Sequence, residues 1–195
     1  YENSKHLTLR YSTSFGISSK LFSPKIKNDI YAIYALVRIA DEIVDSYTGS
    51  DSIDILNSLE AEVYRAVNSK YSSNIVVHAF VNTAQKYNIN ENLIKPFFES
   101  MRMDISQNKY DDALYRKYIY GSAEVVGLMC LRVFVNNNNS LYEELSSGAK
   151  ALGSAYQKVN FLRDFAADFK QLGRIYFPGI SYETFNEVEK NKIIK

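Results

Sequence analysis

Several residue types that carry common functions are scarce in this chain of 195 residues. Cys130 is its only cysteine, so an intrachain disulfide is excluded and a reducing compartment is indicated. His6 and His78 are too few and too scattered for a zinc site, and no Ser-His-Asp arrangement is recognisable. The formal net charge is +1, whereas nucleic-acid-binding domains carry a basic excess. These absences argue against disulfide scaffolds, zinc proteins and nucleic-acid binding.

Long hydrophobic runs are also lacking. The longest are interrupted by Arg38, Asp41 and Glu124, so none can span a membrane. No signal-peptide pattern opens the chain, and Tyr1 in place of a methionine indicates that the native protein starts earlier. Hydrophobic residues make up 46% of the chain, which is enough for the core of a single domain of this length.

Helical periodicity runs through nearly the whole chain, and no strand pattern competes with it. Ser23 before Pro24, Asn90, and Asp111 mark helix starts, and Gly173 marks a helix end. We therefore expect an all-α fold, with helices over about 24–46, 52–69, 75–87, 91–107, from 112 through Gly127, and 140–172.

Two of these helices carry acidic stripes within apolar surroundings. Residues three or four apart share one helix face. One stripe, about 80° wide on a helical wheel, consists of Gln157, Asn160, Asp164 and Asp168. The other, about 60° wide, consists of Tyr34, Arg38, Asp41 and Asp45. A solvated face would carry Lys and Glu opposite one apolar stripe. We expect both helices to be buried, with their carboxylates facing an interior space.

Buried carboxylates need compensation, because an unpaired buried charge costs several kcal/mol. Arg38 and Arg163 are able to neutralise two of the four aspartates. Hard divalent cations suit the others, since Mg²⁺ commonly bridges a few carboxylates to phosphate oxygens. The stripes thus predict a Mg²⁺–diphosphate clamp. The alternative, ordinary ion pairs, is the commoner explanation for one isolated Asp pair but weaker for two.

The two acidic stretches, Ala35 to Asp45 and Gln157 to Asp168, resemble the aspartate motifs of the squalene and phytoene synthase family. Three further segments resemble the family in the same order along the chain, namely Ser12 to Phe15, Tyr118 to Met129, and Gly173 to Pro178. The likeness covers nearly the whole chain.

This resemblance implies an isoprenoid-synthase-like helical bundle around a central cavity. Residues 1–195 would form a single domain that lacks the family's C-terminal helices. The implied reaction is head-to-head condensation of two prenyl diphosphates in carotenoid biosynthesis. The favoured substrate is geranylgeranyl diphosphate, converted to phytoene through a cyclopropyl diphosphate.

The resemblance also implies roles for individual residues. Mg²⁺ would be held by Asp41, Asp45, Asn160, Asp164 and Asp168. Phosphate oxygens would be bound by Ser12, Ser14, Tyr34, Arg38, Gln157 and Arg163, with anchoring of an aspartate as the other role for Arg163. The carbocation would be shielded by Tyr118, Tyr176 and Phe15. For the two serines, composition alone favours helix capping instead.

Small residues in the apolar helices have two interpretations. They would thin the wall of a cavity for hydrocarbon chains, or they would let helices pack closely. The predicted cavity wall consists of Phe15, Gly121, Ala123, Val126, Gly127 and Gly153, and we expect Gly148 to belong to it as well.

Two acidic residues depart from the simple pattern. Glu42 stands where many family members have a second Asp, and we expect it to point off the stripe with little effect. Asp104 lies in a segment that also resembles the family, but pairing with Arg102 or Lys109 is an equally good interpretation.

Several alternatives stay open. One is a squalene or dehydrosqualene synthase that uses farnesyl diphosphate, and another is a non-catalytic relative that binds lipid or acts as an assembly factor. A terpene cyclase would carry a different second motif. Because substrate and product are greasy, we expect a cytoplasmic protein associated peripherally with the inner membrane. No stretch of the sequence indicates which face contacts the membrane, and no pattern indicates the oligomeric state.

Overall fold

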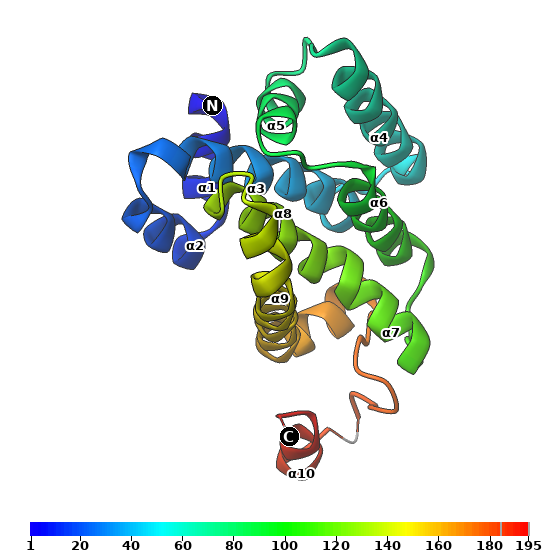
Figure 1. Cartoon of the computed structure of the whole chain (residues 1–195). Helices are drawn as coiled ribbons and strands as arrows, with labels where there is room; N and C mark the ends of the chain where they lie inside the picture. The colour runs from blue at the N-terminus through cyan, green and yellow to red at the C-terminus, as the bar shows by residue number, and fades with distance from the viewer. Residues whose placement is uncertain (184, 195) are drawn as a thin grey trace.

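Helix α3 (Pro24–Asp45) forms the centre of the structure, which is a computed structural model (Figure 1). The structure describes residues 1–183 and 185–194, with all their side chains except those of residues 13, 14 and 192–194. The other elements are α1 (Glu2–Tyr11), α2 (Thr13–Ser18), the 3₁₀ turn η1 (Ser19–Leu21), α4 (Ser52–Ser69), α5 (Ile75–Lys86), α6 (Glu91–Ser106), α7 (Asp112–Ile119), the π-helical turn η2 (Tyr120–Glu124), α8 (Val125–Phe134), α9 (Asn139–Ala167), the π-helical turn η3 (Asp168–Leu172) and α10 (Glu187–Ile194).

The predicted all-α fold is confirmed. Over residues 1–183 and 185–194 no strand forms, and Lys109 and Ile175 make an isolated bridge. The predicted helix through Tyr118 and Gly127 is the run α7–η2–α8, and the long helix continues from α9 into η3. Across the described ranges, no helix combines the length and apolar composition needed to cross a bilayer.

The predicted helix starts are confirmed by their caps. The Ser23 hydroxyl accepts a hydrogen bond from a backbone N–H in the first turn of α3, with Pro24 as the first helical residue. Asn90 and Asp111 accept backbone N–H groups in the first turns of α6 and α7. Gly173 ends the long helix with φ +67°, a left-handed conformation that favours glycine.

The core gathers around α3, which packs against α1, α5, α6 and α8 (Figure 1). Its buried side presents branched aliphatic residues to the aromatic residues of α5 and α6. Burial of such side chains contributes roughly 1.5–3 kcal/mol each. The largest fully buried members of this core include Ile30, Ile33, Phe80, Phe97 and Phe98.

The expectation that α9 is wholly buried is wrong. Of its 29 residues, all within the described part of the chain, Phe161 and Phe165 are the buried ones. Leu152 and Val159 are each 60% exposed. Helices α8 and η2 pack on one side of α9, whereas Leu145, Leu152, Tyr156 and Val159 are exposed.

Gly121 of η2, Gly127 of α8 and Gly153 of α9 lie where helices cross closely, which supports the packing interpretation for these three, whereas Gly148 of α9 has nothing within 4 Å. A methyl group at Gly121 would clash with the Pro96 carbonyl oxygen on α6. At Gly127 and Gly153 it would lie 2.8 Å from the Ala149 carbonyl oxygen and 2.7 Å from that of Ala123. These three glycines therefore face neighbouring backbone rather than a cavity, which corrects the cavity-wall prediction for them.

We predict opposite effects of alanine at two glycines of α9. Gly153→Ala should lower the free energy of unfolding by about 1–3 kcal/mol, because its methyl group overpacks the crossing with η2. Gly148→Ala should raise it by about 0.5–1 kcal/mol, because a methyl group there meets nothing within 4 Å and alanine favours helix. Urea unfolding of both variants measures this, and equal shifts would contradict the assigned crossing.

Candidate active site

The predicted stripe on α3 is present and is crossed by ion pairs. Arg38 Nη1 donates to Asp41 Oδ2 at 3.0 Å, and Arg38 Nη2 binds Glu42. Glu42 therefore shares the arginine with Asp41, so its side chain reaches the stripe instead of pointing off it, while the small expected effect of Glu in place of Asp stays a prediction. The reason is helix geometry, since residues 38 and 42 are one turn apart. The Arg38 guanidinium also lies over the Tyr11 ring, 4.9 Å from its centroid.

Asp41 lies between two other acidic side chains on the same helix. Burial and then the charge of Asp45 raise the pKa of Asp41 to about 7, and Arg38 lowers it only in part. The α3 stripe therefore holds more negative charge than its own arginine neutralises.

The second stripe lies near the C-terminal end of α9. Arg163 binds Asp164 through two hydrogen bonds, Nε to Oδ1 at 2.8 Å and Nη2 to Oδ2 at 2.6 Å. Arg163 thus anchors an aspartate, one of its two expected roles. Its side chain is exposed, so the pair contributes about 0–1 kcal/mol to stability. Gln157 and Asn160 are half-buried on the same helix.

Arg174 links the two stripes at Asp45 and Asp168, since its side chain binds Asp45 and its backbone N–H donates to the Asp168 carbonyl oxygen at 3.1 Å. Burial, followed by the charges of Asp164 and Asp45, raises the pKa of Asp168 to about 6. A carboxylate on α3 thus acts electrostatically on one that follows α9. Arg174 and Arg163 lower the pKa of Asp168 in part.

Arg174 joins this meeting point and was not assigned a role from sequence. Its buried side chain donates from Nη1 to Asp45 Oδ1 at 2.6 Å and from Nη2 to the Val44 carbonyl oxygen at 2.9 Å. The signal available in the sequence was a lone basic residue directly after Gly173, close to the second acidic motif. Its partner Asp45 lies 129 positions away in the sequence, so no local pattern indicated the contact.

Asp104 on α6 is the buried centre of a second group. It accepts hydrogen bonds from the Tyr118 hydroxyl at 2.7 Å and the Tyr176 hydroxyl at 2.8 Å, and lies 3.8 Å from Arg174 Nη1. Burial raises the pKa of Asp104 to about 7, although Arg174 and both tyrosines lower it. The alternative of pairing with Arg102 is wrong, because that arginine binds Glu60 instead.

Aromatic rings enclose this network. Phe161 stacks on Tyr176 with ring centroids 4.1 Å apart and an interplanar angle of 7°, and Tyr118 lies 5.0 Å from Tyr176. Tyr118 and Tyr176 are buried, and their hydroxyls are engaged by Asp104. The two rings predicted to shield a cation are thus fixed in place close to the acidic meeting point.

The N-terminal segment lies against the α3 stripe. Phe15 stacks on Tyr34 with centroids 5.0 Å apart, and the Ser12 hydroxyl accepts a hydrogen bond from the Phe15 backbone N–H at 3.1 Å. Ser12 therefore caps α2, the interpretation favoured by composition. Burial raises the pKa of Tyr34 and the nearby Ser12 hydroxyl lowers it, so this serine also reaches the stripe. The side chain of Ser14 lies outside the described residues.

The remaining predicted wall residues lie at helix contacts. Ala123 is buried under the close approach of Gly153, and Val126 is half-buried against the main core. Phe15 is half-buried on Tyr34.

The acidic residues fit a divalent cation that is shared with a phosphate ligand. In the part of the chain that the structure describes, no three Asp, Glu, His or Cys side chains converge on one point. Mg²⁺ rarely needs such a cage, since it is commonly bound by one or two carboxylates plus substrate phosphates. Burial and then neighbouring carboxylates raise the pKa of Asp41 and Asp168, and a bound cation would relieve the repulsion among these groups.

Comparison with known proteins adds a family. Residues 8–191 match the squalene/phytoene synthase family. The 15-cis-phytoene synthase of Synechococcus elongatus is 31% identical over 202 aligned positions, covering 98% of this chain and 65% of that protein. The 4,4'-diapophytoene synthase of Staphylococcus haemolyticus is 24% identical, covering 99% of this chain and 69% of the relative. This chain therefore spans about two thirds of the length of these relatives.

A solved structure confirms the fold. The squalene synthase HpnC from Alicyclobacillus acidocaldarius superposes with a TM-score of 0.79 at 26% identity, over 91% of this chain and 65% of that one.

We predict that Asp104→Ala destabilises the fold by about 3 kcal/mol, because two buried tyrosine hydroxyls lose their acceptor and Arg174 loses a counter-charge. Arg163→Ala, which breaks an exposed pair, should cost under about 1 kcal/mol. Chemical denaturation measures both. Similar losses in the two variants would show that the Asp104 network does not stabilise the fold.

Proposed function

This chain belongs to the squalene/phytoene synthase family, and on that premise we propose that the protein condenses two prenyl diphosphates head to head, with geranylgeranyl diphosphate as substrate and phytoene as product. The observation that carries the proposal is the approach of Asp45 and Asp168 from two different helices, with Arg174 beside them. Such a site attracts a cation–diphosphate pair.

The residues that would hold Mg²⁺ are Asp41, Asp45, Asn160, Asp164 and Asp168. When bound, the ion stabilises the negative charge that develops on the departing diphosphate. Asp45 Oδ1 is occupied by Arg174, so that carboxylate has its other oxygen to offer. Arg174 thereby orients Asp45 before any ligand arrives.

The arginines, together with hydroxyl groups, supply the phosphate contacts. Arg163 is held by an exposed pair of small net stability, so it is able to turn from Asp164 to a diphosphate at little cost. Arg38 binds both Asp41 and Glu42, so one of its N–H donors is able to turn to a phosphate oxygen while the other contact is kept. Tyr34 and Ser12 present hydroxyls beside it.

These contacts suit an ionisation step. Loss of the first diphosphate leaves an allylic cation, which the double bond of the second substrate attacks. The tertiary cation formed in this way closes the ring of a cyclopropyl diphosphate by losing a proton, which the departed diphosphate accepts. This intermediate ionises again and rearranges, and the departed diphosphate takes the final proton. The Tyr118 and Tyr176 rings would face the cation, and their fixed positions limit water entry.

The main alternative is a farnesyl diphosphate substrate, giving dehydrosqualene or squalene. Higher identity to the cyanobacterial phytoene synthase than to the staphylococcal diapophytoene synthase supports the longer substrate. A non-catalytic, lipid-binding role is disfavoured because all four aspartates are present.

We predict that a non-hydrolysable geranylgeranyl thiodiphosphate stabilises the protein only together with Mg²⁺. At a ligand concentration about a hundred times the Kd, the free energy of unfolding should rise by about 2.7 kcal/mol. Asp41→Ala and Asp164→Ala should abolish the effect, because each removes a carboxylate from a different stripe. Thermal unfolding with and without EDTA measures it.

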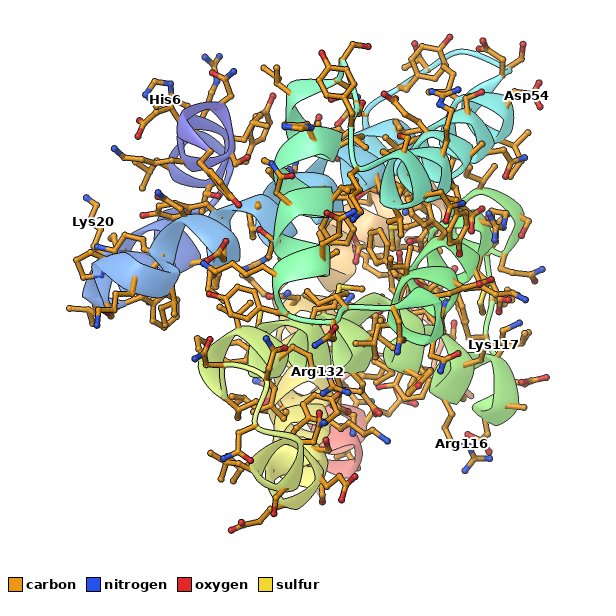
Figure 2. The ribbon with its side chains drawn as sticks, turned by 45° about the horizontal axis from the view of Figure 1, so that its top comes forward. His6, Lys20, Asp54, Arg116, Lys117 and Arg132 are labelled. Atoms are coloured by element: carbon orange, nitrogen blue, oxygen red, sulfur yellow. The ribbon has the colours of Figure 1, made fainter. Side chains whose placement is uncertain are left out.

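Asp54→Ala is the matched control for these variants, since it removes an exposed aspartate of α4 (labelled in Figure 2). It should retain the full shift. Stabilisation by the ligand without Mg²⁺, or stabilisation that persists in Asp41→Ala, would contradict the proposed Mg²⁺–diphosphate clamp.

Product analysis separates the substrates. We expect phytoene from geranylgeranyl diphosphate, and at least tenfold slower turnover of farnesyl diphosphate, as one missing isoprene unit removes well over 1.4 kcal/mol of apolar contact. Chromatography of the products formed from each substrate measures this. Preferential formation of dehydrosqualene, or of squalene when a reductant is supplied, would contradict the proposed phytoene synthesis and support farnesyl diphosphate as the substrate.

A further inference from the structure

The segment α2–η1 ends in unusually exposed apolar side chains. Leu21 is 86% exposed, the highest value among the large hydrophobic residues described, and Ile17 is 62% exposed. The two are four positions apart in a continuous helical run, so they share one face. In Figure 1 this segment projects at the edge of the molecule, away from α4 to α7.

The apolar surface continues onto the end of α8. Phe22, which follows Leu21, packs its ring against that of Phe134, with centroids 5.5 Å apart. Phe134 is itself 48% exposed. We name this surface, made of Ile17, Leu21, Phe22 and Phe134, the apolar tip.

Positive charge surrounds the apolar tip. Residues 3–28 contain five basic residues and no acidic one, although the whole chain carries only +1. Lys27 Nζ donates to the Lys20 carbonyl oxygen at 2.8 Å, which places its ammonium on η1. Lys25 is exposed in the first turn of α3, and Lys20 extends outward from the segment (Figure 2).

We propose that the apolar tip and these three lysines dock the protein on an anionic lipid bilayer. Exposed apolar side chains flanked by lysines are the combination that binds a membrane interface, with the apolar groups inserted and the ammonium groups at the lipid phosphates. A second copy of the chain is a poorer occupant, because a symmetric contact would bring the same positive charges together.

The position of the apolar tip links docking to the proposed site. Helix α2 contains Phe15, which stacks on Tyr34 of the α3 stripe. The docking surface therefore lies on the same short segment that contacts the site, where greasy substrates would arrive from the bilayer. Docking goes beyond the proposed reaction and does not depend on it.

The exposed apolar side of α9 is the competing surface. Leu152 and Val159 are as exposed as Ile17. Residues 139–168, however, contain four acidic and three basic residues, so this helix offers an anionic surface no net attraction.

Vesicle flotation tests the proposal with no substrate or metal. Wild type should bind vesicles of phosphatidylcholine and phosphatidylglycerol in equal parts at least tenfold better than pure phosphatidylcholine vesicles, and salt should weaken the binding. Ile17→Ser combined with Leu21→Ser should reduce binding at least tenfold. Lys20→Gln combined with Lys25→Gln should reduce it about fivefold for each lysine removed.

Two double variants serve as matched controls. Leu152→Ser with Val159→Ser removes equally exposed apolar groups, and Lys95→Gln with Lys158→Gln removes exposed lysines elsewhere. Both should bind like wild type, and melting curves establish that each variant is folded. Since all the substituted side chains at the tip are exposed, folding should be retained.

Three results would overturn the proposal. They are failure of wild type to float with the anionic vesicles, a loss of binding in the α9 variant that equals or exceeds that in the tip variant, and a wild-type oligomer that the tip variant converts to monomer in ultracentrifugation. Because vesicle binding is measured without substrate, failure of the proposed reaction would be seen separately, in the thiodiphosphate and product measurements.

Discussion

Arg174 enters the interior beside the end of α3, where it binds Asp45 at 2.6 Å and the Val44 carbonyl oxygen at 2.9 Å and lies 3.8 Å from Asp104. This guanidinium is the positive charge on which the acidic region depends. Without it, the buried Asp104 carboxylate of α6 would lose its counter-charge, at a cost of several kcal/mol. Its fork geometry also orients Asp45, so the same contact that stabilises the fold prepares the site.

The helices that bring the second acidic stripe to this point are placed by small residues. Gly127 allows α8 to approach the backbone of α9, Gly153 allows α9 to approach that of η2, and Gly121 allows η2 to approach that of α6. Tyr118 at the end of α7 is thereby held beside Asp104, and Phe161 of α9 is held on Tyr176. Close packing at the helix crossings thus positions the side chains that form the polar network at the site.

Much of the fold and part of the site could be read from the sequence, because helices and their caps are local. Pro24 after Ser23, and Asp41 and Asp45 one turn apart, carry their meaning within a few residues. Two expectations failed for different reasons. Periodicity assigns a residue to a helix face but does not say whether another helix covers that face, so α9 was expected to be buried. Glu42 was expected to point off the stripe, but its side chain reaches back one helical turn to Arg38.

The sequence by itself determined an all-α chain with two acidic stripes, and it also contains the basic N-terminal segment that flanks the apolar tip. The tertiary structure alone decided that Arg174 reaches Asp45 across 129 positions, and that Asp104 collects two tyrosine hydroxyls from distant segments. Helical periodicity records only neighbours within a few turns, whereas a contact between distant residues depends on how whole helices cross, which no local spacing encodes.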